Sequence, residues 1–106
     1  MKKPTIALLA LLSFTVHAAE PDGATLTKTM RCYSCHDLVK PLIGPPYQAI
    51  AVRHAADKEL MVDVLARKIV KGGGGNWGVV PMVPNEHVSE ADARTLAAWI
   101  LAQVPK

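Results

Sequence analysis

Five consecutive residues, Cys32-Tyr33-Ser34-Cys35-His36, place two thiols three positions apart with an imidazole directly after the second. This spacing is the attachment signature of c-type haem. If the segment is helical, the thiols and the imidazole fall on one face, because steps of three and four nearly complete a turn. Cys32 and Cys35 would then form thioether bonds with the porphyrin, and His36 would be an axial ligand of the iron.

Two other interpretations of the cysteine pair have less support. A redox-active disulfide at this spacing needs a βαβ context, and no run of alternating apolar residues supplies its strands. A zinc site needs further ligands at short spacing, whereas His54 and His87 are far apart in the chain. The adjacent histidine and the N-terminal export pattern described below favour haem attachment.

Haem iron bound by His36 needs a sixth ligand or an open position where something reacts. The candidates are the methionines and histidines outside the motif: Met30, Met61, Met82, His54 and His87. The first two methionines occupy apolar helical positions, where methionine usually fills a core, and the two histidines have polar neighbours. Met82 lies in a loop between Pro81 and Pro84, which restrict the backbone as a weak thioether ligand requires. We therefore expect Met82 to be the second axial ligand, the alternative being a buried methionine that binds nothing.

Two further loops carry candidate contacts to the cofactor. Pro45 and Pro46 stiffen the turn after the motif, so that the Pro45 carbonyl is free to accept a hydrogen bond from Nδ1–H of His36. An ordinary rigid turn is the equally acceptable interpretation of this segment. Trp77 follows a run of four glycines and lacks the Lys-Ser/Thr of a phosphate-binding loop. A buried indole N–H needs an acceptor, and a haem propionate is a good candidate.

Helical periodicity predicts the elements that hold these residues. A helix from Ala24 to about Tyr33, capped by Asp22, carries the haem motif at its end, and a short helix follows from Tyr47 to His54. A third helix over 57–71 repeats Met61, Leu65 and Ile69 at steps of four, with Asp57 as its cap and Gly72 as its stop. The last helix starts at Ser89-Glu90-Ala91-Asp92 and runs from 90 to about 103. Its apolar stripe is expected to cross the first helix near Leu26, and it comprises Ala93, Leu96, Ala97, Ile100 and Val104.

The N-terminus has the pattern of a cleaved export signal. Two lysines precede an apolar run, Ile6 to Leu12, that is too short to span a membrane, and Val16-His17-Ala18 is a small-residue cleavage site. We favour cleavage after Ala18 over Ala19, which predicts a signal peptide at 1–18 and one domain at 19–106. Neither a lipid anchor nor a retained membrane anchor is expected. The predicted location is the bacterial periplasm.

The mature chain is small and nearly uncharged. Removal of residues 1–18 leaves 88 residues with 10 Lys and Arg against 9 Asp and Glu, a net charge of +1. No basic cluster with interleaved aromatics is present, so nothing indicates nucleic-acid binding. A chain of this size usually needs a staple, and a covalent haem would serve as staple and as part of the core.

Taken in order, the haem motif, the Gly44-Pro45 turn, Trp77 and the loop 81–85 make the chain resemble a small bacterial class I cytochrome c, over about residues 22–104. The resemblance implies an all-α fold of three main helices plus a short helix around one covalent haem c. It implies His36 and Met82 as iron ligands, a Pro45 carbonyl against His36, Trp77 on a propionate, and Asn85 hydrogen-bonded near the Met82 sulfur. It also implies that Lys68 stands near a propionate, while the four-glycine run departs from the family pattern.

The function expected from this resemblance is that of a monomeric periplasmic one-electron carrier and not of an enzyme. Its redox partners would be an upstream cytochrome or quinol-oxidising complex and a downstream nitrite reductase, oxidase or peroxidase. Two alternatives are an electron-transfer subunit of a larger respiratory enzyme and a haem enzyme or gas sensor in which Met82 is displaceable. Ligation by His and Met leaves no open position on the iron, and no acid–base pair or substrate pocket is evident, which favours the carrier.

Overall fold

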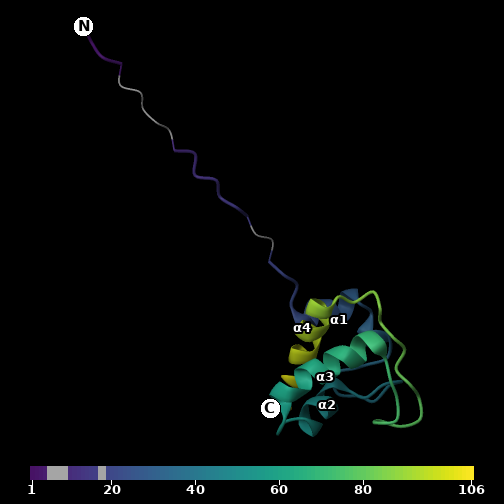
Figure 1. The fold of residues 1–106 in the computed structure, drawn as a ribbon. Coiled ribbons are helices and arrows are strands. Elements are labelled where there is room, and N and C mark those ends of the chain that lie inside the picture. Colours follow the sequence, from purple (N-terminus) through teal and green to yellow (C-terminus); the bar gives the residue numbers. More distant parts are fainter. Residues whose placement is uncertain (5–9, 17–18) are drawn as a thin grey trace.

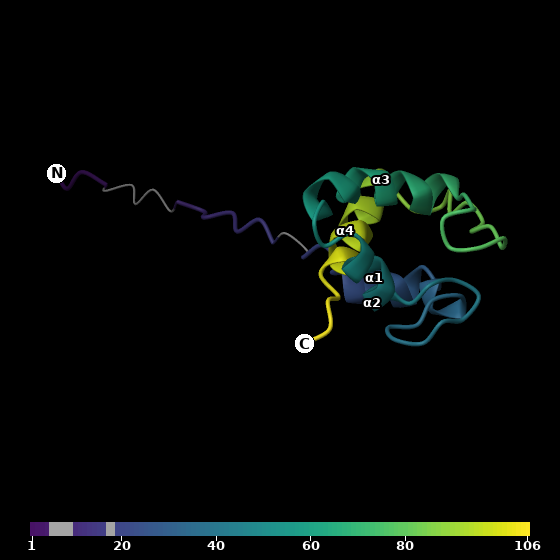
Figure 2. The same ribbon diagram turned by 90° about the horizontal axis from the view of Figure 1, so that it is seen from below.

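The computed structural model describes residues 1–4, 10–16 and 19–106, and residues 19–106 contain every helix described (Figures 1 and 2). The predicted signal peptide includes residues 5–9 and the cleavage-site residues 17–18, which lie outside the described part. The signal peptide and its boundary with the domain therefore stay predictions. Within the described ranges, no helix has the length and apolar character needed to span a membrane.

The fold is all-α, as predicted. Four α-helices follow one another in the described residues: α1 (Gly23–Thr29), α2 (Tyr47–Arg53), α3 (Lys58–Lys71) and α4 (Glu90–Leu101). A 3₁₀ turn, η1 (Cys32–Ser34), lies between the first two. In the part of the chain that the structure describes, the only strand-like pairing is an isolated bridge between Gly73 and Met82.

Side-chain caps begin two of the described α-helices, α1 and α4. The Asp22 carboxylate accepts from the N–H of Thr25 at 2.7 Å, and the Ser89 hydroxyl accepts from the N–H of Asp92 at 3.1 Å. Gly72 ends α3 with a positive φ of 72°. Asp57 precedes α3, but its side chain makes no capping hydrogen bond and lies 3.6 Å from Nδ1 of His54. Asp57 therefore occupies the predicted N-cap position of α3 but does not cap the helix through its side chain.

The first helix is shorter than predicted and does not carry the cysteine motif. It ends at Thr29, Met30 is its C-cap, and Arg31 adopts a left-handed conformation with φ of 62°. Threonine is a weak helix former, and the hydroxyls of Thr27 and Thr29 donate back to carbonyls of their own helix. The motif therefore begins a separate turn, and a continuous helical face is not what brings its residues together.

The core forms where α4 crosses α1 and packs along α3. Its buried side chains include Leu26 from α1, Ile69 from α3 and, from α4, Ala93, Leu96, Ala97 and Ile100. Gly23 allows the crossing, since a Cβ there would overlap the Trp99 side chain. The expected contact of α4 with the first helix is confirmed, with one correction to the stripe. Val104 lies beyond the end of α4 and is 52% exposed.

Candidate haem-binding site

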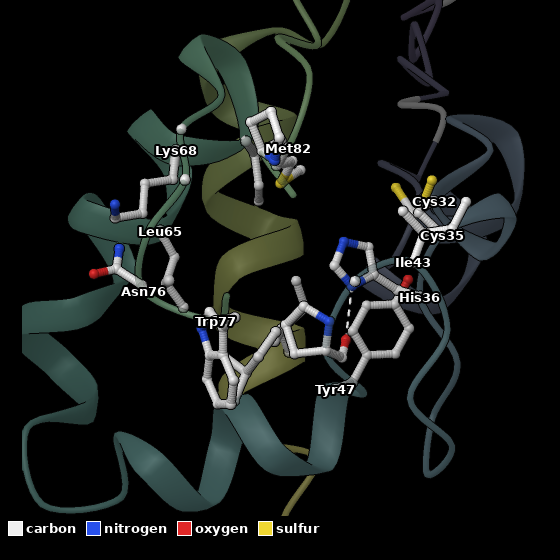
Figure 3. A pocket seen from close by; sticks show the side chains of 18 of the residues that line it. Cys32, Cys35, His36, Ile43, Tyr47, Leu65, Lys68, Asn76, Trp77 and Met82 are labelled. Carbon is white, nitrogen blue, oxygen red and sulfur yellow. Dashed lines mark hydrogen bonds between the residues drawn. The ribbon is translucent and has the colours of Figure 1, made fainter. Parts of the chain in front are cut away.

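A cavity of about 770 Å³ opens between α2, α3, the cysteine motif and the long segment that joins α3 to α4. Its volume lies in the range of small-molecule and cofactor sites, and most of its walls are apolar. All the site residues predicted from the sequence line this cavity: Cys32, Cys35, His36, Pro45, Trp77, Met82 and Asn85. Residues from four separate stretches of the chain thus meet around one space (Figure 3).

The motif forms one wall of the cavity. The N–H groups of Cys35 and His36 both donate to the carbonyl of Cys32, at 3.1 and 3.0 Å, which closes the turn. Both cysteines are free and half-buried, and burial raises the pKa of the Cys32 thiol. The close-up view shows the two sulfurs side by side on the same side of the site as His36 (Figure 3).

The imidazole of His36 is held by its neighbours. Its Nδ1 lies 2.7 Å from the carbonyl oxygen of Pro45, and its ring stacks on Tyr47 with centroids 5.6 Å apart and planes 23° apart. Gly44 packs against the ring, because a Cβ there would lie 2.8 Å from Nδ1. With Nδ1 engaged as a donor to a carbonyl, Nε2 is the nitrogen that remains to bind a metal.

Tyr47 is a site residue that sequence reasoning did not identify beyond its place at the start of a helix. It is 1% exposed, lines the cavity, and contacts Tyr33 and Trp99 edge-on in addition to His36. Burial raises the pKa of its phenol, which therefore stays protonated. Its hydroxyl has no hydrogen-bond partner within the described ranges. Its position directly after two prolines was the available signal, since a rigid turn fixes the direction of the next side chain.

Met82 approaches from the other side of the cavity (Figure 3). Its main chain pairs with Gly73 through two hydrogen bonds of 2.7 and 3.1 Å. Gly72 is also close, since a Cβ there would lie 2.5 Å from the carbonyl oxygen of Met82. The end of α3 therefore fixes the backbone position of this methionine.

Asn85 ties the same loop to α3. Its N–H donates to the carbonyls of Ile69 and Val70, and its side-chain Nδ2 donates to the carbonyls of Ile69 at 3.0 Å and Val83 at 3.2 Å. The structure thus pairs the amide with main-chain carbonyls next to Met82. The predicted interaction with the Met82 sulfur stays a prediction.

The other candidate ligands fall into two groups. Met61 and His54 line the cavity, which corrects the view of Met61 as core filler and of His54 as a solvated side chain. Met30 packs against the core, and His87 is exposed. Met61 lies on the regular helix α3. Met82 instead lies in a loop whose backbone is hydrogen-bonded to Gly73, directly after α3, through Met82 itself and to α3 through Asn85.

Trp77 and Lys68 complete the wall on the side of Met82 (Figure 3). Trp77 is 46% exposed, and the guanidinium carbon of Arg53 lies 4.6 Å from the centroid of its ring. Arg53 is a second residue that sequence reasoning missed. Its only sequence signal was a basic residue in the last turn of a short helix, a common position for an arginine.

The residues around the cavity fit a covalently attached haem. Two unpaired thiols and an imidazole with one nitrogen held and one free are the groups that attachment and ligation require, and the apolar lining suits a porphyrin. The unpartnered hydroxyl of Tyr47 is a buried polar atom with which a bound group can pair. A zinc site has no corresponding support, because no group of three or more His, Cys, Asp or Glu side chains gathers in the described ranges. Fold and cavity together define a small helical protein built around one prosthetic group.

Comparison with known proteins identifies the family. No family model matches the chain. Cytochrome c-551 of Azotobacter vinelandii is 46% identical over 79 residues, covering 74% of this chain and 94% of that protein. Cytochrome c-552 of Nitrosomonas europaea is 39% identical over 101 residues, covering 95% and 97%. The crystal structure of wild-type Nitrosomonas europaea cytochrome c552 superimposes with a TM-score of 0.72 at 44% identity, over 76% of this chain and 98% of that one.

The chain belongs to the small monohaem class I cytochromes c of the c-551 and c-552 type. It is a one-electron carrier with a single covalently bound haem c, it is not an enzyme, and it works with other redox proteins. The all-α fold, the haem and the carrier function expected from the sequence are thereby confirmed.

Proposed function

We propose that the carrier exchanges electrons through a haem closed on both faces by His36 and Met82. Cys32 and Cys35 are the thioether attachment sites in this proposal. The observation that carries it is the placement of a braced imidazole and a braced methionine on opposite sides of one cavity (Figure 3). When bound, the haem supplies an iron that cycles between Fe(II) and Fe(III).

Each of the surrounding residues has a defined task in this proposal. The Pro45 carbonyl accepts from Nδ1–H of His36, which fixes the ring and makes the imidazole a better donor to iron. Asn85 keeps the Met82 loop on α3 through the carbonyls of Ile69 and Val83, and a contact of Asn85 with the Met82 sulfur would add to this. Trp77 lines the cavity where its indole N–H can donate to a propionate.

Occupancy of both axial positions suits a carrier because it keeps the iron away from small molecules. Methionine opposite histidine also raises the reduction potential relative to two histidines. The cavity lining includes exposed apolar side chains at its rim, namely Ile43, Val79, Val80 and Val83. An exposed apolar rim of this kind supports a brief, weak encounter with a redox partner.

We also propose where the carrier works and with what. The N-terminal export pattern supports a signal peptide at 1–18, a mature domain at 19–106 and a periplasmic location. The upstream partner would be a cytochrome or a quinol-oxidising complex, and the downstream partner a nitrite reductase, an oxidase or a peroxidase. A monomer without a membrane anchor is the state proposed.

Spectroscopy of the purified holoprotein tests the closed haem. The denatured protein should retain haem after acid extraction, the native protein should show reversible reduction, and the ferrous form should not bind carbon monoxide. Ready carbon monoxide binding, or peroxidase turnover without prior unfolding, would show that one axial position is open. Elution of the native periplasmic protein as part of a larger complex would indicate a subunit and not a free carrier.

A further inference from the structure

The segment that carries Met82 is attached firmly at its base and weakly along its length. It joins α3 to α4, and residues 74–81 within it form a long loop, called the excursion below (Figure 1). The pairing of Gly73 with Met82 closes the base. Between these residues the chain uses positive φ at Gly75 and Gly78, where a Cβ would meet nothing within 4 Å. The excursion therefore has glycine flexibility and little packing of its own.

Arg53 contacts the excursion at its far end. This residue ends α2, and its Nη1 donates to the carbonyl of Asn76 at 2.8 Å. The same guanidinium lies over the ring of Trp77, 4.6 Å from the centroid. One side chain thus binds both the main chain and the aromatic ring of two consecutive residues. A planar guanidinium with several donors can do this, whereas an ammonium or an amide fulfils only one part.

The contact bridges two walls of the haem cavity. Arg53, Asn76, Trp77 and Met82 all line it, and the last three lie on the side opposite His36 (Figure 3). If the far end of the excursion moves away from α2, the segment pivots about its base, where Met82 lies. The position of a side chain that must stay on iron therefore depends on how well that far end is held.

We propose that Arg53 is a positioning residue that clamps the excursion at Asn76 and Trp77 to α2 and so keeps Met82 on the iron. The inference rests on the proposed ligation by Met82. It assigns to Arg53 a structural effect on ligand retention, distinct from any effect of its charge on the reduction potential. Loss of the clamp leaves haem attachment intact and makes the methionine easier to displace.

The test measures displacement of the methionine in the ferric holoprotein with imidazole as the probe. Loss of the absorption band of Met-ligated ferric haem reports the rate at which imidazole displaces the methionine and the apparent affinity for imidazole. Arg53→Gln removes the cation from the face of the Trp77 ring and leaves at most a weaker, uncharged hydrogen bond to the Asn76 carbonyl, so it should raise both by about fivefold. Arg53→Lys keeps a cation near the Trp77 ring, so its displacement rate and its affinity for imidazole should lie between those of wild type and Arg53→Gln. Lys58→Gln removes the same charge from an exposed position outside the cavity and should behave as wild type.

Each outcome decides the proposal. Equal displacement in wild type, Arg53→Gln and Lys58→Gln overturns the clamp, as does a change confined to the reduction potential. If Arg53→Gln yields no holoprotein, Arg53→Lys against wild type carries the same comparison. A wild-type protein without the methionine band overturns the proposed ligation itself, and that failure is recognised before any Arg53 variant is measured.

Discussion

Nδ1 of His36 lies 2.7 Å from the carbonyl oxygen of Pro45, so the turn that follows the cysteine motif supports the motif's own histidine. Pro45 follows His36 by nine positions, and Gly44 beside it packs against the same ring. The stiff Gly-Pro-Pro sequence is what keeps that carbonyl in place. A hydrogen bond of this type makes the imidazole more basic, which stabilises Fe(III) relative to Fe(II).

Loosening this turn should therefore raise the reduction potential. Pro45→Gly frees the backbone at the accepting carbonyl, and we expect a rise of up to about 60 mV, equivalent to a tenfold change in relative affinity for the two iron states. Voltammetry of the holoprotein measures it. Pro41→Gly, at an exposed proline outside the cavity, is the control and should leave the potential unchanged. A fall in potential for Pro45→Gly would contradict the assigned role of the carbonyl.

Gly72 and Gly75 test how closely the end of α3 holds the Met82 loop. Both have positive φ, 72° and 88°, so alanine at either position costs about 1–3 kcal/mol of backbone strain. Only at Gly72 would the new Cβ also collide with the carbonyl of Met82, whereas nothing lies within 4 Å at Gly75. We expect Gly72→Ala to lower the free energy of unfolding more than Gly75→Ala and to weaken the methionine band. Equal effects in denaturant titrations would show that the collision is relieved without consequence.

Gly23→Ala sets helix propensity against packing. Alanine is the better helix former by up to about 1 kcal/mol, the value for a helix interior, and Gly23 is the first residue of α1, so propensity alone predicts a protein that is somewhat more stable. The new Cβ would overlap Trp99 at the crossing of α1 and α4, and overpacking typically costs about 1–3 kcal/mol. We expect the packing term to prevail and the free energy of unfolding to fall. An increase in the thermal midpoint would show that the two helices separate easily at this point.

The cap of α1 predicts a defined acid response. The N–H of Thr25 donates to the Asp22 carboxylate and lowers its pKa below that of the unfolded chain. Its contribution to stability is therefore complete above the unfolded value of about 3.9 and is lost as pH falls through the lower folded value. Asp22→Asn keeps a capping oxygen that does not titrate. The stability of wild type relative to Asp22→Asn should decrease as denaturant titrations move from neutral pH to acid, and a constant difference would contradict the cap.

The sequence predicted the chemistry of the site better than its local geometry. The spacing of the two cysteines and the prolines around Met82 can be read directly from the sequence. Cys32, Cys35 and Met82 all line the cavity. The periodicity extends the predicted first helix to about Tyr33 because Met30 and Arg31 are ordinary helix formers, whereas the helix ends at Thr29, before the left-handed Arg31. Tyr47 and Arg53 were missed because their importance comes from residues distant in sequence, His36 for one and Trp77 for the other.

The central claim is that Met82, opposite His36, closes the haem iron. The most direct measurement is the absorption spectrum and reduction potential of ferric and ferrous Met82→Ala holoprotein, with Met61→Leu as the control because Met61 lines the same cavity. We expect Met82→Ala to lose the band of Met-ligated ferric haem, to have a lower potential and to bind carbon monoxide when reduced. Met61→Leu should keep the wild-type spectrum. A Met82→Ala protein that retains the band and the potential would contradict the account.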